Sequence, residues 1–269
     1  MFRSPVLIVT DASFNLLYGP SRIKLKCYKT SVEFFRRVIP VLVDESAGPS
    51  LVALAAEGAS KTPWAVIFPY RYLEGAAFYK ENHADIPVFV MAGRSPKPRG
   101  ESDLVFVCTD FVQDLYRAGL CAALLAGDKR VVFLNDENFK NEHFRAFREG
   151  LRFQGFLDDP YFISAYQEYS SNSDVGCAVI AGPAVKFLEE DRQIPLILFS
   201  WLDPVQLPRT VKLVFDDSPW AMAATVLKLM PLPEAELFLP SEPVILLGKD
   251  EKKNFRNFES FIKEKFENN

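Results

Sequence analysis

The sequence contains few of the residues that build metal sites and disulfide frameworks. Of its 269 residues only two are histidine and four are cysteine, namely Cys27, Cys108, Cys121 and Cys177, and no two cysteines have CxxC spacing. Structural zinc sites need clusters of these residues, and disulfide frameworks are typical of small secreted chains with little core. We therefore expect no metal, no cofactor, and cysteines buried as small hydrophobic side chains.

Long hydrophobic runs are also missing. No apolar run approaches the ~20 residues that cross a bilayer, so we expect no direct membrane insertion. Met1 to Pro5 lead directly into a strand pattern, without the charged and apolar regions of a signal peptide. The expected location is cytoplasmic if the chain is full length. It is periplasmic, or lipid-anchored outside the cytoplasm, if a leader has been removed.

A basic surface and the common catalytic motifs are absent as well. The chain has 31 Lys and Arg against 35 Asp and Glu, a net charge of −4, whereas a nucleic-acid partner requires a positive face. There is no P-loop, GxGxxG after a strand, GxSxG or HExxH. Asp158-Asp159, Asp216-Asp217 and His143 are expected on solvated surfaces. We therefore expect neither a nucleic-acid partner nor catalysis.

Buried strands alternating with helices make up what is present. Continuous apolar runs such as Val6–Thr10 are typical of strands covered on both faces in a parallel sheet. Strands are predicted at 6–10, 39–43, 64–68, 86–91, 104–108, 131–134, 162–166, 175–180, 194–199, 211–215 and 243–247. Helices are predicted at 32–38, 50–59, 72–83, 112–126, 138–151, 184–190, 219–229 and 254–266. This order predicts parallel, three-layer α/β/α sheets.

Three local patterns add detail. Residues 23–27 alternate like a half-exposed strand, which predicts a hairpin-like insertion after the first strand, with Thr30 or Ser31 capping the next helix. The helix that Pro49 opens has a predicted core stripe at Leu51, Leu54, Ala55 and Ala59. The helix at 112–126 has a small-residue face that would let it lie close to a sheet, formed by Leu115, Ala118, Gly119 and Ala122.

Four segments carry a resemblance to a known family. They are Thr109-Asp110 with the helix containing Arg117-Ala118-Gly119, Lys129–Leu134 followed by Phe144–Gly150, Ile194–Asp203, and Val211–Asp217 leading into Trp220. Their order resembles the type I periplasmic binding protein fold, shared by sugar- and nucleoside-binding proteins and by the sensor domains of LacI-type repressors. No helix-turn-helix precedes Val6, which disfavours a repressor.

The resemblance implies two lobes joined by a multi-strand hinge. Lobe one would comprise residues 1–109 and about 207–235, and lobe two residues 110–206 and about 236–269, with Thr109 and Asp110 at the hinge. A ligand would bind between the lobes, which would close around it by a hinge motion.

Candidate ligand-binding residues follow the predicted strands, because ligands of open parallel sheets bind beyond the carboxyl ends of the strands. Those of lobe one are Asp11, Ser13, Phe14, Tyr70, Arg71 and Arg94, and those of lobe two are Asn135, Asp136, Asn138, Tyr166, Trp201 and Asp203. Their rings, carboxylates and amides suit a sugar or nucleoside. If Arg71 and Arg94 both face the cleft, a carboxylate or phosphate ligand is favoured instead.

Each candidate also has a purely structural alternative. Asp11 and Asp136 are suited to cap the following helices, and Asp203 before a proline is suited to a turn. Trp201 follows an apolar strand and fits a core position. Arg71 and Arg94 are equally compatible with ordinary surface charge.

The expected function is non-catalytic binding of a small solute for uptake or sensing, with a membrane transporter or receptor as a potential partner. One alternative is a two-lobed α/β enzyme resembling uroporphyrinogen-III synthase, which should lack the late strand at 194–203 and the return helix at Trp220. The other is an interaction module of the same fold whose cleft is filled by its own side chains.

Overall fold

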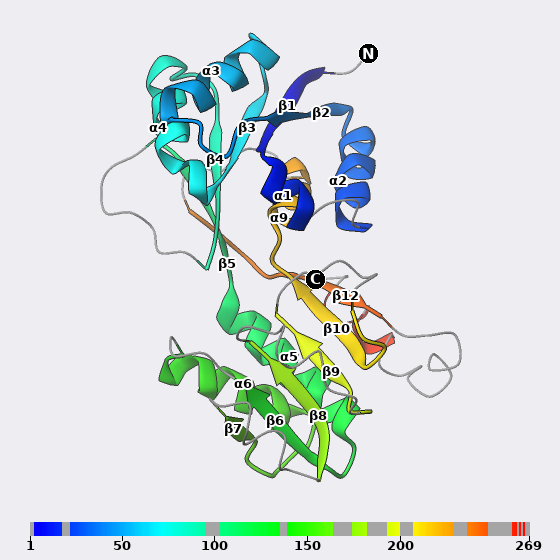
Figure 1. Ribbon diagram of the computed structural model, residues 1–269. Coiled ribbons are helices and arrows are strands. Elements are labelled where there is room, and N and C mark those ends of the chain that lie inside the picture. The colour runs from blue at the N-terminus through cyan, green and yellow to red at the C-terminus, as the bar shows by residue number, and fades with distance from the viewer. Residues whose placement is uncertain are drawn as a thin grey trace. The chain divides into compact units, whose positions relative to one another are not determined.

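The computed structural model describes residues 3–17, 22–94, 103–134, 139–163, 174–181, 193–199, 207–228, 236–246, 260–262, 264 and 266. The chain divides into two compact units (Figure 1). Unit 1 comprises Met1–Thr109, Leu202–Pro204 and Asp217–Leu239. Unit 2 comprises Asp110–Trp201, Val205–Asp216 and Pro240–Asn269.

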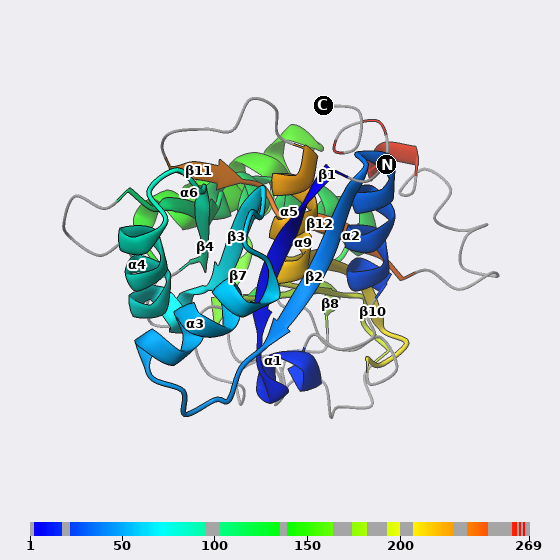
Figure 2. The same ribbon diagram turned by 90° about the horizontal axis from the view of Figure 1, so that it is seen from above.

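Unit 1 is built on a parallel sheet with the strand order β11-β5-β4-β3-β1-β2. Figure 2 shows β1 between β2 and β3, and helices α3 and α4 lie on the face opposite α2 and α9 (Figure 1). The elements are β1 (Arg3–Thr10), α1 (Ala12–Leu17), α2 (Arg22–Glu33), β2 (Arg36–Leu42), α3 (Pro49–Ala59), β3 (Ala65–Pro69), η1 (Tyr70–Tyr72), α4 (Leu73–Asn82), β4 (Val88–Gly93), β5 (Val105–Thr109), α9 (Pro219–Lys228) and β11 (Leu237–Leu239).

The central strand of this sheet is apolar throughout because it is covered on both faces. Val6, Leu7, Ile8 and Val9 are at most 1% exposed. Leu7 and Val9 join the core formed with α3 and α4, so the alternate residues face the other side. The unbroken hydrophobic run is thus a direct consequence of the layered architecture.

Unit 2 contains a second sheet with the order β12-β10-β9-β8-β6-β7, in which all pairs are parallel except β10 with β12. The prediction of two mostly parallel α/β sheets is confirmed. Its elements are α5 (Phe111–Ala126), β6 (Arg130–Leu134), α6 (Asn141–Phe153), β7 (Tyr161–Ile163), β8 (Val175–Ile180), β9 (Leu196–Leu198), β10 (Val211–Asp216) and β12 (Glu242–Ile245).

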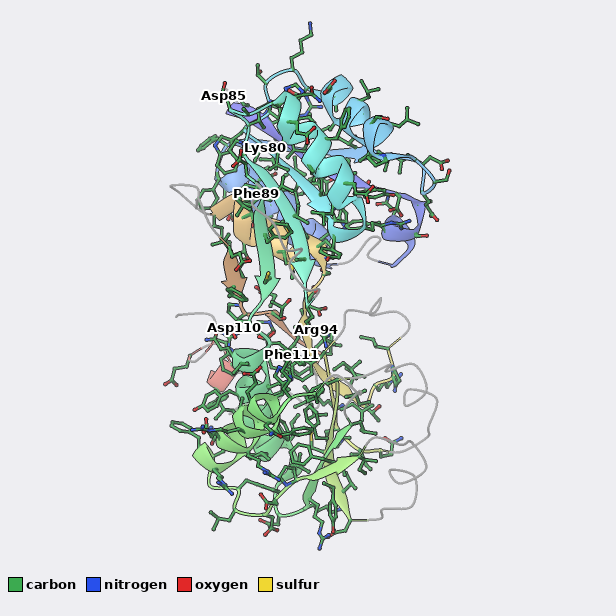
Figure 3. The ribbon with its side chains drawn as sticks, turned by 90° about the vertical axis from the view of Figure 1, so that its left-hand side faces the viewer. Lys80, Asp85, Phe89, Arg94, Asp110 and Phe111 are labelled. Carbon is green, nitrogen blue, oxygen red and sulfur yellow. The ribbon has the colours of Figure 1, made fainter. Side chains whose placement is uncertain are left out.

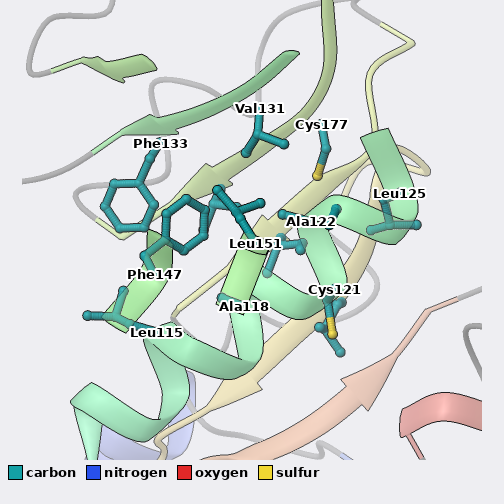
Figure 4. Close-up of a cluster of buried hydrophobic side chains, with 14 of the residues drawn as sticks. Leu115, Ala118, Cys121, Ala122, Leu125, Val131, Phe133, Phe147, Leu151 and Cys177 are labelled. Atoms are coloured by element: carbon teal, nitrogen blue, oxygen red, sulfur yellow. The ribbon is translucent and has the colours of Figure 1, made fainter. Parts of the chain in front are cut away.

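Small residues allow α5 to lie against both the sheet and α6. Ala118 and Ala122 belong to the core cluster with Val131 and other strand residues (Figure 4). Gly119 instead faces α6, where a Cβ atom would collide with the Phe147 carbonyl oxygen. Gly150 of α6 faces α5 in the same way, since its Cβ would collide with the Tyr116 carbonyl oxygen. Gly119 therefore serves the helix–helix contact and not the predicted contact with the sheet.

The sequence predictions after β1 were wrong. Helix α1 follows β1 directly, and residues 23–27 belong to helix α2 and not to a strand. Thr30 and Ser31 lie inside this helix instead of capping the next one, and the predicted helix at 32–38 is instead the end of α2, a turn at 34–35 and the start of strand β2. The buried residues of α2 include Cys27, Thr30 and Ser31, which have the i, i+3, i+4 spacing of one helical face. Packing of α2 against α9 favours the helical conformation of these residues over the predicted strand.

The predicted core stripe of α3 was also wrong. Leu51 and Leu54 are 60% and 56% exposed, whereas Val52, Ala53 and Ala56 are buried. Val52 packs against α4, where a Cβ on Gly75 would lie 2.9 Å from Val52 Cγ1. The packing partner, and not the size of the leucines, decides which face turns inward.

The chain crosses between the units at sites that differ in part from those expected. The first crossing lies between Thr109 and Asp110. The sequence placed the return to the first lobe near residue 207, but β10 pairs with β9 in unit 2 and the return falls at Asp217. Strand β11, which was not predicted, pairs with β5 in unit 1. The predicted helix at 184–190 lies outside the described residues.

Candidate functional site

The topology of unit 1 points to one edge of its sheet. Strands β2 and β3 pair in parallel with opposite sides of β1. The chain therefore adds β2 on one side of β1 and then continues with β3 on the other side, which makes β1 and β3 the switch point of the strand order. Ligands of open α/β sheets bind beyond the carboxyl ends of the strands at such a switch point. Asp11–Phe14 and Tyr70–Tyr72, which follow β1 and β3, are therefore the primary candidates.

A cavity of about 320 Å³ lies at this edge. Its walls come from the carboxyl ends of β1, β3 and β4 and from the start of α9. The lining residues are Ser13, Phe14, Pro69, Tyr70, Arg71, Met91, Ala92, Gly93, Asp217, Pro219 and Met222. We call this cavity the switch-point pocket. All of its residues belong to unit 1.

Asp11 lies behind the pocket wall and is fully buried. Its Oδ1 accepts a hydrogen bond of 2.7 Å from the Phe14 backbone amide, so it does cap α1. Its Oδ2 accepts a 2.7 Å hydrogen bond from the Tyr72 hydroxyl and lies 3.0 Å from Arg71 Nη1. The carboxylate therefore organises the pocket wall and is not simply a helix cap.

The 3₁₀ turn η1 presents Tyr70 and Arg71 to the pocket and buries Tyr72 behind them. The Arg71 side chain is 44% exposed, whereas Tyr72 is 6% exposed. Burial, followed by the hydrogen bond to Asp11, raises the pKa of Tyr72 well above its usual value. Tyr72 therefore stays protonated and donates to Asp11 at neutral pH.

Ser13 is held by a residue that the sequence did not single out as a site residue. The Ser13 amide and hydroxyl donate hydrogen bonds of 2.7 and 2.6 Å to Glu45 Oε1. Glu45 follows β2, so the rule that polar residues after a buried strand meet at one edge would have found it.

Arg94 and Asp217 form an ion pair at the same edge. Arg94 Nε and Nη2 lie 3.2 and 3.0 Å from Asp217 Oδ2. The two side chains are 31% and 22% exposed. Arg94 lies at the end of unit 1 opposite Asp85, which marks the amino-terminal side of the sheet (Figure 3). The expectation that Asp216 and Asp217 occupy a solvated turn was wrong, because Asp216 is buried and Asp217 lines the pocket.

The apolar part of the pocket is continuous with the core of unit 1. Phe14 is only 4% exposed and packs edge-on against the fully buried Trp220, with ring centroids 5.8 Å apart. Met91 and Met222 line the cavity beside it. Tyr70 is partly exposed, so it is the lining ring with the most surface left for a ligand to stack on.

The candidates from the second lobe are not placed. Asn135, Asp136, Asn138, Tyr166, Trp201 and Asp203 all lie outside the described residues and stay predictions. The N-cap of α6 is Lys140, so this helix begins later than the predicted range 138–151. Asp110 Oδ1 accepts from the Gln113 amide at 3.0 Å and caps α5, while a hinge role for Thr109 and Asp110 stays a prediction.

A second cavity of about 580 Å³ lies over α6 in unit 2. Its lining includes Arg145, Arg148 and Arg152. Arg145 pairs with Glu149 at 2.8 Å, and the other two lie 3.5 and 3.7 Å from Asp159. These side chains are 42–81% exposed, which is typical of a solvated helix face. This cavity therefore does not indicate a ligand-binding site.

The described residues contain no group of three or more His, Cys, Asp and Glu side chains placed to hold a metal ion. Within the same residues, no helix has both the length and the apolar character needed to cross a membrane.

Comparison with known proteins gives matches in structure alone. No family model and no curated sequence matches the chain. A periplasmic ribose ABC transporter protein of Conexibacter woesei is 16% identical, with a TM-score of 0.54 over 96% of this chain and 97% of that one. A solute-binding protein of Actinobacillus succinogenes with bound D-allose is 12% identical, with a TM-score of 0.51 over 93% and 100%.

A regulator has the same architecture. A transcriptional activator of the comK gene from Bacillus halodurans is 12% identical, with a TM-score of 0.64 over 98% of both chains. At such identities the likeness defines the fold and leaves the ligand open. The resemblance predicted from the sequence is confirmed at that level: the chain has the two-lobed α/β fold of the type I periplasmic binding proteins.

Proposed function

We propose that this protein binds a small polar solute without transforming it, and serves solute uptake or sensing. The observation that carries the proposal is the switch-point pocket. It lies where ligands of open α/β sheets bind, and combines an aromatic surface at Tyr70 with polar groups at Ser13, Arg71 and Asp217. Apolar lining with a few convergent polar groups is the usual composition of a small-molecule site.

The comparisons support a sugar ligand, and the chemistry of the pocket extends the proposal to a nucleoside-like one. A protein of this fold is named for ribose transport, and another contains bound D-allose. Rings that stack on a sugar or base, together with donors and acceptors for hydroxyl groups, are the features such ligands need. By the same reasoning, a membrane transporter or a receptor is the partner we propose.

The two alternative functions have less support. The synthase-like enzyme should lack the late strand and the return helix, yet β9 (Leu196–Leu198) and α9 (Pro219–Lys228) are both present. An interaction module with a filled site is disfavoured by the open switch-point pocket. Binding that also involves unit 2, with hinge closure, stays a prediction.

A thermal-shift screen of the whole chain against sugars, nucleosides and amino acids tests the proposal. A ligand that binds only the native state stabilises it by about 2.7 kcal/mol at one hundred times its Kd, and stabilisation grows with the logarithm of concentration. We expect at least one sugar or nucleoside to raise Tm in this way. Absence of any shift at millimolar concentration across these classes would overturn the proposal.

Replacement of Tyr70 locates the site. Tyr70→Ala removes the most accessible ring of the pocket, and we expect a roughly tenfold increase in Kd, or ~1.4 kcal/mol. Tyr161→Ala is the matched control, because Tyr161 is an exposed tyrosine of β7 in unit 2. Equal affinities for the two variants would place the ligand elsewhere.

A further inference from the structure

The charged groups at the switch-point pocket are already paired within unit 1. Arg71 pairs with Asp11 and Arg94 with Asp217, while Glu45 accepts both polar hydrogens of Ser13. Two cations therefore face two anions, and Glu45 adds a further negative charge. Among the residues that the structure describes at this edge, an incoming carboxylate or phosphate finds no net positive charge.

The carboxylate of the Arg71–Asp11 pair is more deeply buried than that of the Arg94–Asp217 pair. Asp11 is completely buried, and its oxygens have three donors, namely the Phe14 amide, the Tyr72 hydroxyl and Arg71 Nη1. A buried carboxylate that loses its cation leaves a charge in a poorly solvated place, which is costly. A ligand anion that drew Arg71 away from Asp11 would have to offset that cost.

Arg71 nevertheless keeps capacity for a ligand. A guanidinium has five N–H donors, and the pair with Asp11 is made through Nη1. The side chain is 44% exposed and lines the cavity. Arg71 therefore offers donors whose positive charge is balanced behind the pocket wall, an arrangement suited to hydroxyl and carbonyl oxygens.

We propose that the pocket selects uncharged, oxygen-rich ligands, with Arg71 as the contacting donor and with Asp11 and Tyr72 as its positioning residues. The inference rests on the proposed function and restricts the class of ligand that the pocket would bind. It also decides against the carboxylate or phosphate ligand that two unpaired arginines would have favoured. The Tyr72 hydroxyl holds Asp11 Oδ2, the oxygen that holds Arg71.

Matched neutral and anionic ligands test the selectivity on the unaltered protein. The pairs are glucose and glucuronate, galactose and galacturonate, and uridine and uridine monophosphate, with affinity measured by calorimetry at two salt concentrations. For the pair whose neutral member binds, we expect the anion to bind at least roughly tenfold more weakly, as one unfavourable charge at short range predicts. Salt should leave the neutral affinity unchanged. Equal or tighter binding of the anion would refute the inference.

Asp11→Asn tests the origin of the selectivity. It keeps the size of the side chain, removes its charge and leaves Arg71 uncompensated. We expect the ratio of anionic to neutral affinity to rise roughly tenfold. Asp85→Asn is the control, since Asp85 is exposed at the opposite end of unit 1 (Figure 3). An unchanged ratio in a folded Asp11→Asn protein would refute the role of Asp11, and if that variant does not fold, the wild-type comparison still decides.

Tyr72→Phe tests positioning without changing charge. We expect the neutral ligand to bind several-fold more weakly while the anion-to-neutral ratio stays the same. Tyr79→Phe is the control, because Tyr79 is also a buried tyrosine, lies in α4 and does not line the pocket. If Tyr72→Phe binds like wild type, Tyr72 is not a positioning residue.

The outcomes separate this inference from the proposed function. Binding of a sugar or nucleoside that shows no preference for neutral forms leaves the function standing and refutes the inference. Failure of every neutral and anionic probe to bind the wild-type protein refutes the proposed function itself, and the inference with it.

Discussion

At the scale of single residues, burial controls the chemistry of this protein more than residue type does. All four cysteines are buried, and burial raises the pKa of the Cys27 thiol to about 12. Burial also raises the pKa of the Cys121 and Cys177 thiols. Thiolate is the reactive form of cysteine, so these side chains act as small hydrophobic groups.

The cysteines should therefore be unreactive in the folded protein. We expect fewer than one of the four thiols to react with a thiol reagent at mildly alkaline pH over an hour, and all four to react in denaturant. Mass spectrometry of the labelled chain measures both. Rapid labelling of Cys27 or Cys121 in the native state would contradict the packing described.

Alkaline pH should destabilise the fold through these same groups. Cys27 and Tyr79 have pKa values raised to about 12 in the folded state by burial, so the unfolded chain loses their protons first. Stability is then fully present below the unfolded values and falls above about pH 9, by up to ~1.4 kcal/mol per pH unit for each ionising group. Urea unfolding between pH 7 and 11 measures the slope. Cys27→Ala should reduce it.

At the scale of elements, the contact between α5 and α6 depends on two glycines that face opposite helices. A Cβ at Gly119 or Gly150 would collide with a backbone carbonyl oxygen of the other helix. Backbone cannot move aside as a flexible side chain can, so the two helices must separate if either glycine is replaced. The helical periodicity of α5 is local and was predicted, whereas this partner was not.

Gly119→Ala and Gly150→Ala should each destabilise unit 2. We expect about 1–3 kcal/mol, the usual cost of overpacking, measured by urea denaturation. Gly58→Ala in α3 is the control, because a Cβ there meets nothing within 4 Å. It should be neutral or stabilising by up to ~1 kcal/mol. Equal effects at all three positions would mean that helix propensity, and not the close approach, controls the result.

At the scale of the whole molecule, two of the segments that cross between the units are hydrogen-bonded to each other within each unit. In unit 1 β11 pairs with β5, where Leu239 lies opposite Thr109. In unit 2 the fully buried Asp114 accepts the Ser241 amide at 2.9 and 3.1 Å. Arg117 Nη1 donates to the Ser241 carbonyl at 3.4 Å. The first and last crossings are thus bonded both before and after the boundary.

Asp114→Ala should loosen the last crossing. It leaves Arg117 buried without its nearest carboxylate and Ser241 without its acceptor, so we expect a loss of about 3–5 kcal/mol. Hydrogen exchange should accelerate at residues 236–246 before the rest of the chain. Asp128→Ala, at an exposed turn after α5, is the control. Unchanged exchange at 236–246 would show that Asp114 does not hold this segment.

The sequence predicted the sheets and part of the candidate site for identifiable reasons. Strands β1 and β3 are continuous and apolar, so their positions and the polar residues after them, Ser13 after β1 and Arg71 after β3, follow from local pattern. Glu45 and Asp217 also follow predicted strands, but their pairing partners depend on strand order, which brings Ser13 to Glu45 across 32 positions and Arg94 to Asp217 across 123. Local periodicity contains no information on such pairs.

The sequence by itself determined the alternation of strands and helices and the parallel two-sheet architecture, because hydrophobic periodicity and turn chemistry act over a few residues. Only the tertiary structure decided that residues 23–27 are helical, that Val52 and not Leu51 turns inward, and that Asp11 cancels the charge of Arg71. Each of those outcomes depends on a packing partner distant along the chain. Partners of this kind exist only once the sheet has assembled.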